Sequence, residues 1–349
     1  MLSTIMRPLY RFACFTAGAI LLLICSGGLV TSTNSGLAVP DWPNSYGYNM
    51  FTFPWPRWSS GGVFHEHSHR LIASGVGLLT VILAVWLWIS EPRRWLKMLG
   101  LVAVVAVVLQ GGLGGLRVIA LKDEIGIFHA GLAQAFLCLI CFIAFALSRT
   151  WDRLAATACL DVAARNKLRT LVVLVTALIY GQLLLGATMR HAHAELSIRD
   201  FPLAYGRILP PLDAASLARI NADRLDRLSL PPTTRAQIVL QMLHRFGALL
   251  VGLGVCAVAF VAARNRTLPA SIRRGTLIWP MLIVAQIILG MYTIWTQKAA
   301  DVATSHVALG AVSLVTGVML AAMLSRLGAT PSLLARRVQS SARRVEVAA

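Results

Sequence analysis

Two short segments that each end in His-Arg stand at the start of long apolar runs in this 349-residue sequence. The first reads Phe-His-Glu-His-Ser-His-Arg and ends with His69 and Arg70, and the second reads Gln-Met-Leu-His-Arg and ends with His244 and Arg245. Ionisable side chains are costly at a membrane boundary, so by default they mark a functional site. Because the pair occurs at matching places in the two halves of the chain, we expect these residues to bind a cofactor.

His129 and His306 extend this pattern, because each lies in a later apolar run of its own half. Each half then carries one histidine on its second helix and one on its fourth, at comparable depth. Two imidazoles that face each other across a helix bundle suit the two axial positions of a haem iron. The alternative is that all four are interior histidines bonded to neighbouring carbonyl groups. Their recurrence in a duplicated pattern favours haem ligation.

An acidic residue distinguishes the first half from the second. Glu66 lies about one helical turn before His69 and therefore shares its face of the helix. The matching residue of the second half is Gln241. This difference predicts one reactive site and one site for structure or electron transfer. Alternatively, Glu66 is a solvated glutamate stabilised by the helix dipole.

The two arginines that follow the histidines have a predicted role of their own. Arg70 and Arg245 would sit at the rim of the bundle, where a guanidinium group pairs with the propionates of a haem. The alternative for both is contact with lipid headgroups. Four further histidines have no assigned role: His65, His67, His191 and His193.

Composition places the chain among membrane proteins. It is 57% hydrophobic and only 13% charged, which is unlike a soluble domain. Its apolar runs have the length of about 20 residues that crosses a hydrocarbon core. The net charge of +18 does not indicate a nucleic-acid partner, because the basic residues cluster at the ends of apolar runs, where they set topology. We predict an all-α integral membrane protein with eight spans: 12–30, 64–89, 98–118, 126–148, 170–189, 238–263, 275–295 and 303–325.

Basic residues are concentrated at the N-terminus and in alternate connections, 91–97, 149–169 and 264–274, as well as in the tail 331–349. By the positive-inside rule, both termini lie on the cytoplasmic side of the inner membrane and the haem sites lie near its outer face. The segment 190–236 is expected outside although it holds seven arginines. Long loops translocate with less regard to charge, and aspartates are interspersed among the arginines.

The two halves repeat residue by residue. Gln110, which is followed by glycines, corresponds to Gln286. The loop 41–47 corresponds to the loop 200–206. Each half holds four spans, so both enter the membrane in the same direction, as in a parallel repeat related by an axis along the membrane normal. The expected units are two parallel-repeat four-helix bundles, 1–150 and 165–330, and a basic cytoplasmic tail, 331–349.

Taken together, these residues resemble the haem A synthase family. The resemblance covers nearly the whole chain and rests on the following residues: the loop 36–43, Glu66, His69, Arg70, Gln110, His129, His244, Arg245 and His306. It implies a membrane oxidoreductase that oxidises the position-8 methyl group of haem O to the formyl group of haem A, for cytochrome oxidase assembly. It also implies that the first half handles the substrate haem through Glu66, His69 and His129, and that the second half holds haem b through His244 and His306.

The partners that the resemblance implies are haem O itself, haem O synthase (a farnesyltransferase), the terminal oxidase assembly machinery and an electron donor that the sequence does not identify. A homo-oligomer is left open. Many relatives carry a cysteine pair in the first outer loop, where this chain has Val39 and Ser45. Thiol chemistry in that loop is therefore absent here.

Two other functions share some of these features. A di-haem b-type electron-transfer protein would have the same bundles and histidine pairs but would leave its haem groups unmodified. A transporter is indicated only by the parallel repeat and the polar residues within the membrane, and it would be colourless when purified.

Overall fold

The computed structural model describes residues 2–159 and 161–329, and this part of the chain is helical, with isolated β-bridges but no strand. Eight of its helices are long and apolar enough to cross a membrane. This confirms the prediction of a multi-pass, all-helical membrane protein. The basic tail predicted at 331–349 lies outside the described residues. The eight long helices are α1 (Leu2–Ser32), α3 (Gly61–Ser90), α4 (Arg94–Ala120), α5 (Asp123–Ala146), α7 (Val162–His191), α9 (Arg235–Arg264), α10 (Ala270–Trp295) and α11 (Ala300–Arg326).

The fourth span ends earlier than predicted. The apolar run was expected to continue to residue 148, but α5 ends at Ala146. The hydroxyl of Ser148 accepts a hydrogen bond from the backbone N–H of Trp151 and caps a separate amphipathic helix, α6 (Arg149–Ala156). A serine that caps a following helix ends the preceding one, because its backbone is extended.

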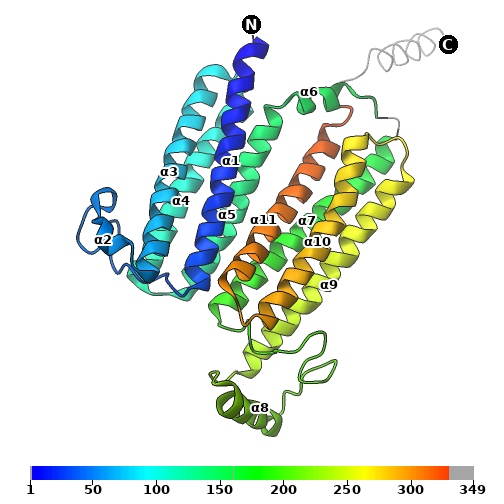
Figure 1. Ribbon diagram of the computed structural model, residues 1–349. Coiled ribbons are helices and arrows are strands. Elements are labelled where there is room, and N and C mark those ends of the chain that lie inside the picture. Colours follow the sequence, from blue (N-terminus) through cyan, green and yellow to red (C-terminus); the bar gives the residue numbers. More distant parts are fainter. Residues whose placement is uncertain (1, 160, 330–349) are drawn as a thin grey trace, which may run out of the picture.

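Two other short helices lie in the connections at the opposite end of the molecule from α6 (Figure 1). They are α2 (Trp55–Trp58), which follows the short 3₁₀ turn Met50–Thr52, and α8 (Ala214–Leu228). Asp213 caps α8 by accepting a hydrogen bond of 2.8 Å from the backbone N–H of Ser216. We refer below to the α6 end, where α1 begins and α11 ends, and to the loop end, which carries α2 and α8.

The long helices contact one another in two rings of four. In the first ring α1 contacts α3, α3 contacts α4, α4 contacts α5, and α5 contacts α1. In the second ring α7, α9, α10 and α11 contact one another in the same cyclic order. Helices α5 and α11 and their neighbours α1 and α7 join the two rings along the middle of the molecule (Figure 1). In each ring the second and fourth helices therefore stand opposite each other.

Side chains in the rings follow the pattern of a membrane bundle. Interior residues such as Leu83, Ile140 and Trp279 are almost completely buried, and the indole Nε1 of Trp279 donates to the carbonyl of Ser313 at 2.9 Å. Large apolar side chains also cover the outer faces, where they would meet lipid tails. Because lipid is as apolar as these side chains, close packing and interhelical hydrogen bonds hold such helices together.

Candidate functional site

Each of the four histidines predicted as ligands packs against a glycine of the preceding helix in its ring. A Cβ atom placed on any of these glycines would lie 3.1 or 3.2 Å from the imidazole Cε1 atom. That is tighter than an ordinary carbon contact, so only glycine lets the ring take this position. The four pairs are His69 with Gly27, His129 with Gly114, His244 with Gly186, and His306 with Gly290.

The histidines face each other in pairs across the two rings. His69 on α3 and His129 on α5 are within electrostatic range of each other. The same holds for His244 on α9 and His306 on α11. Since α3 and α5 stand opposite in the first ring, and α9 and α11 opposite in the second, the histidines of each pair approach from opposite sides of the bundle interior.

Three of these histidines have no hydrogen-bond partner for their side chains among the described residues. The Nδ1 atoms of His69, His129 and His306 are buried and unpaired. Only His244 has one, because its Nδ1 lies 3.1 Å from the amide Nε2 of Gln182. Burial of an unpaired polar atom is costly. The alternative of histidines satisfied by backbone carbonyls is therefore not supported. The Nε2 atoms of these three histidines also make no hydrogen bond with the described residues and are not enclosed, so Nε2 is the nitrogen that can bind a ligand.

Glutamine side chains fix the backbone of three of the histidines. Gln110 on α4 donates to the carbonyl of His129 at 2.9 Å, and Gln286 on α10 donates to that of His306 at 2.8 Å. Both bonds join neighbouring helices, and the two glutamines hold matching positions in the repeat. Gln182 on α7 does the same for His244 at 2.7 Å.

Gln182 was not predicted, although the sequence contains a signal for it. Each of the three glutamines stands four residues before the glycine that receives an imidazole. In a helix this spacing places the amide and the glycine on one face. The matching position on α1, before Gly27, is Leu23.

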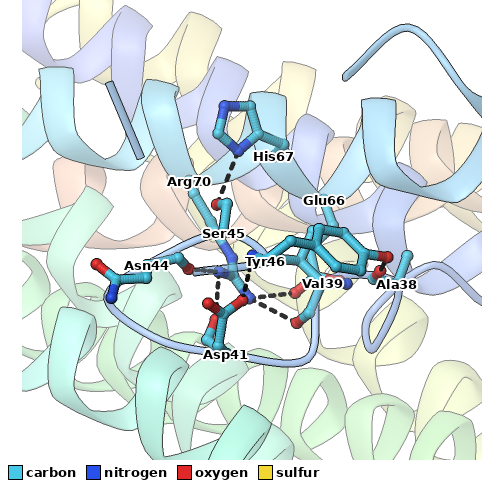
Figure 2. A network of polar contacts seen from close by, with 9 residues as sticks. All are labelled: Ala38, Val39, Asp41, Asn44, Ser45, Tyr46, Glu66, His67 and Arg70. Atoms are coloured by element: carbon cyan, nitrogen blue, oxygen red, sulfur yellow. Dashed lines mark hydrogen bonds and ion pairs between the residues drawn. The ribbon is translucent and has the colours of Figure 1, made fainter. Parts of the chain in front are cut away.

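Glu66 is not a solvated glutamate, because it is buried, with 4% of its surface exposed. Its Oε2 accepts a hydrogen bond of 2.8 Å from the backbone N–H of Val39, and its Oε1 lies 2.7 Å from Nη2 of Arg70. Arg70 also donates from Nη1 to the carbonyls of Asp41 and Asn44, at 2.7 and 3.0 Å. Figure 2 shows how these two side chains of α3 hold the loop between α1 and α2.

The loop of the second half is held in the same way without an acid. Gln241 accepts from the backbone N–H of Ile198 at 2.5 Å and donates to the carbonyls of Glu195 and Ile198, both at 3.0 Å. Arg245 donates to the carbonyls of Leu203 and Asp200, at 2.9 and 2.8 Å. A neutral amide therefore suffices to bind the loop, so binding the loop does not account for the negative charge of Glu66.

An aspartate closes the turn inside each loop. Asp41 accepts hydrogen bonds from the backbone N–H groups of Tyr46 and Gly47, at 2.6 and 2.8 Å. Partial burial acts to raise the pKa of Asp41, but these hydrogen bonds outweigh it and hold the pKa below its ordinary value. Asp200 accepts the corresponding bonds from Tyr205 and Gly206, both at 2.8 Å.

Two arginines that sequence analysis did not single out lie near the histidines. Arg117 on α4 is within electrostatic range of His69 and His129, and it makes no hydrogen bond or ion pair with the described residues. Arg190 on α7 is within range of His306 and donates from Nη2 to the hydroxyl of Ser32 at 2.5 Å, while its Nε is buried and unpaired. Both are single cations at the loop end of long apolar helices.

The remaining histidines are dispersed. His67 is buried between Phe53 and Trp58, and its Nδ1 lies 3.1 Å from the hydroxyl of Ser45. His191 packs against Gly126 of α5. In addition, His65 is half-buried beside an aromatic ring and His193 is exposed. In the part of the chain that the structure describes, no group of three or more histidine, cysteine or acidic residues is placed to hold a metal ion.

Comparison with known proteins yields one family and a consistent set of relatives. A family model described as COX15-CtaA, cytochrome oxidase assembly protein, matches residues 59–319, which include α3 and the four histidines. A haem A synthase from Geobacillus kaustophilus is 28% identical over 307 residues, 86% of this chain and 86% of the relative. The haem A synthase from Shouchella clausii is 30% identical over 290 residues, 78% of this chain and 93% of the relative.

Proposed function

This chain belongs to the COX15-CtaA family of cytochrome oxidase assembly proteins, and from this we propose that it is a haem A synthase. It would oxidise the position-8 methyl group of haem O to the formyl group of haem A, for use in cytochrome oxidase. The observation that carries the proposal is the pair of facing histidines in each ring, each imidazole seated against a glycine. Relatives that bear the name haem A synthase and cover most of the chain support it.

The two halves would divide the work. We assign the substrate haem to residues 1–150, with His69 and His129 as ligands, and a resident haem b to residues 165–330, with His244 and His306. The matching loops and the two rings of helices support a parallel repeat of two four-helix bundles. Both termini would face the cytoplasm, because the basic connections gather at the α6 end. The sites at the loop end would then lie near the outer face of the inner membrane.

The donor set fits haem in both rings. Two imidazoles from opposite helices, most with unpaired ring nitrogens, match the axial ligation of haem iron. When bound, haem b would supply electron relay, because a bis-histidine iron has no open position for oxygen. In the first half, His69 and His129 would hold the substrate haem while its methyl group is oxidised.

Glu66 would act on the substrate. Its carboxylate is buried and fixed by Val39 and Arg70, so it has little freedom to turn away from the site. A fixed negative charge can stabilise positive charge that develops at the methyl group, or move protons to and from it. Gln241 is neutral, so it cannot stabilise positive charge in this way or act as a base. This difference agrees with oxidation of haem in the first half only.

For the propionate contacts we propose different arginines from Arg70 and Arg245, which the sequence suggested. Arg70 and Arg245 use their terminal nitrogens on loop carbonyls, so we propose that they hold the loops over the two sites. Arg117 and Arg190 are within electrostatic range of the histidines, and Arg117 makes no hydrogen bond or ion pair with the described residues. We therefore assign propionate contacts to Arg117 in the first half and to Arg190 in the second.

The proposed function is tested by measuring whether the protein converts haem O to haem A. The protein would be produced in cells that make haem O, and the haem extracted from membranes would be identified by mass analysis. A haem A synthase yields haem A. A di-haem electron carrier yields haem O unchanged, and that result would replace the proposal with the electron-transfer alternative.

A further inference from the structure

The segment between α7 and α9 forms an open cleft at the loop end of the second ring, next to the end of α10. Its volume is about 780 Å³. The cleft is bordered by the loop that Gln241 and Arg245 hold, by one face of α8, and by Ile294 and Trp295. It contains four of the seven arginines in the segment 190–236, namely Arg199, Arg207, Arg219 and Arg224.

Two of these arginines, Arg199 and Arg224, are within electrostatic range of each other. Burial lowers the pKa of Arg224, Tyr205 acts to raise it, and the guanidinium group of Arg199 acts to lower it. Arg224 is 7% exposed and is fixed by the carbonyls of Leu196 and Pro231, at 2.8 and 2.9 Å. Arg199 makes no hydrogen bond or ion pair with the described residues, and its Nε is buried. Like charges within electrostatic range of each other repel, and an anion between them would lower the energy of the protein.

The lining holds four arginines and two aspartates, Asp200 and Asp223, so positive side chains are in excess by two. Asp200 also accepts from the backbone N–H groups of Tyr205 and Gly206. Asp223 lies 3.1 Å from Nε of Arg227, which is not among the residues that line the cleft. Arg207 is exposed and has no side-chain partner in the described part of the chain. The cleft therefore holds uncompensated positive charge.

An apolar track leads from the membrane into the cleft. Trp295 lines the cleft and packs against Tyr292 with ring centroids 5.6 Å apart. Tryptophan and tyrosine prefer the level of lipid headgroups. Exposed apolar side chains continue from there along a single face of α10, with the spacing of a helical stripe: Met281, Val284, Ile288, Tyr292 and Trp295.

From these features we propose that the cleft binds the phosphate headgroup of an anionic phospholipid, whose acyl chains lie along the exposed face of α10. Arginine pairs with phosphate through two parallel hydrogen bonds, which matches the unpaired donors of the cleft. The proposal also accounts for arginines at this end of the bundle. The positive-inside rule places topology-setting charges at the α6 end, so these have no role in topology. The proposed lipid site does not depend on the haem reaction proposed above.

The test uses the full-length protein in detergent, titrated with lipid and followed by native mass spectrometry. Phosphatidylglycerol should bind at one site, and phosphatidylcholine should bind at least about tenfold more weakly, as expected for charge-assisted hydrogen bonds. The double variant Arg199→Gln/Arg207→Gln should lose this preference. Arg235→Gln removes the same charge from the same segment but lies outside the cleft lining, so it should bind like the wild type.

Each other outcome overturns the proposal. Equal binding of the two lipids, or unchanged binding in the double variant, means that the cleft does not select the headgroup. Inorganic phosphate that binds as tightly as the lipid, and displaces it, assigns the site to free phosphate instead. If neither lipid nor inorganic phosphate binds, the proposal is wrong, and an acidic segment of a protein becomes the next candidate partner. If the double variant fails to fold, Arg207→Gln alone carries the test, because this exposed side chain makes no contact that folding requires.

Discussion

Oε1 of Glu66 lies 2.7 Å from Nη2 of Arg70, one helical turn along α3, and both side chains are buried. In the second half, Gln241 and Arg245 occupy the same two places and hold the same kind of loop. Glu66 is an acid that pairs with Arg70, whereas Gln241 is neutral and donates to the carbonyls of Glu195 and Ile198. Comparison of Glu66 with Gln241 therefore separates the role of this position in holding the loop from the role of its negative charge.

Replacement of Glu66 by glutamine should therefore preserve the loop and abolish turnover. The amide can accept from Val39 as Gln241 accepts from Ile198. Loss of a general acid or base costs about 10²-fold or more in rate. The measurement is haem A formed per haem-loaded protein, with Glu124→Gln, an exposed glutamate on α5, as the control. Full activity of Glu66→Gln would remove Glu66 from the catalytic residues.

Addition of a methyl group at Gly114 should disturb the first site. Cβ of Gly114→Ala would lie 3.2 Å from Cε1 of His129, so the imidazole must shift. Gly111 on the same helix has open space around it, so Gly111→Ala is the matched control. The haem absorption spectrum should change in the first variant only. Alanine favours a helix over glycine by up to about 1 kcal/mol, so lost helix stability cannot explain the change.

The second half offers the same comparison on α7. Gly186→Ala would place its Cβ 3.1 Å from Cε1 of His244, whereas Gly181 has open space around it. We expect Gly186→Ala to lower the haem b content of the purified protein, while Gly181→Ala retains it. Equal haem content in the two variants would show that the glycine does not position the ligand.

Replacement of Arg117 by glutamine should weaken haem binding in the first half. A charge-assisted hydrogen bond contributes about 1.5–3 kcal/mol, so retention of haem O should fall about tenfold or more. Arg94→Gln, at the opposite end of the same helix, removes the same charge far from the loop end and should have no effect. The measurement is haem O retained through purification, per mole of protein. Retention equal to that of the wild type would exclude a propionate contact.

The first loop should become less stable in acid. The pKa of Asp41 is lowered in the folded protein, so its ionised form contributes stability at neutral pH that is lost as the pH falls through the folded pKa. As the pH falls below about 4, protease cleavage of this loop should increase in the wild type. Asp41→Asn should show smaller pH dependence. Equal pH dependence of the two proteins would contradict this role for Asp41.

Features that depend on residue spacing within a single helix could be predicted from the sequence. The eight spans follow from apolar length, and the asymmetry of Glu66 and Gln241 follows from helical spacing. The partners of Arg70 could not be predicted, because they are backbone carbonyls of a loop whose path is set by tertiary contacts. The proximity of Arg117 to two histidines also depends on how α4 is rotated in the ring, which a nearly uniform apolar sequence does not specify.

The central claim is that the two histidine pairs hold haem for different purposes. The most direct measurement is the identity of the haem extracted from His69→Ala and His244→Ala, beside the wild type. We predict that His69→Ala loses haem O and haem A and keeps haem b, and that His244→Ala loses haem b. Loss of the same haem in both variants, or haem b alone in the wild type supplied with haem O, would contradict the account.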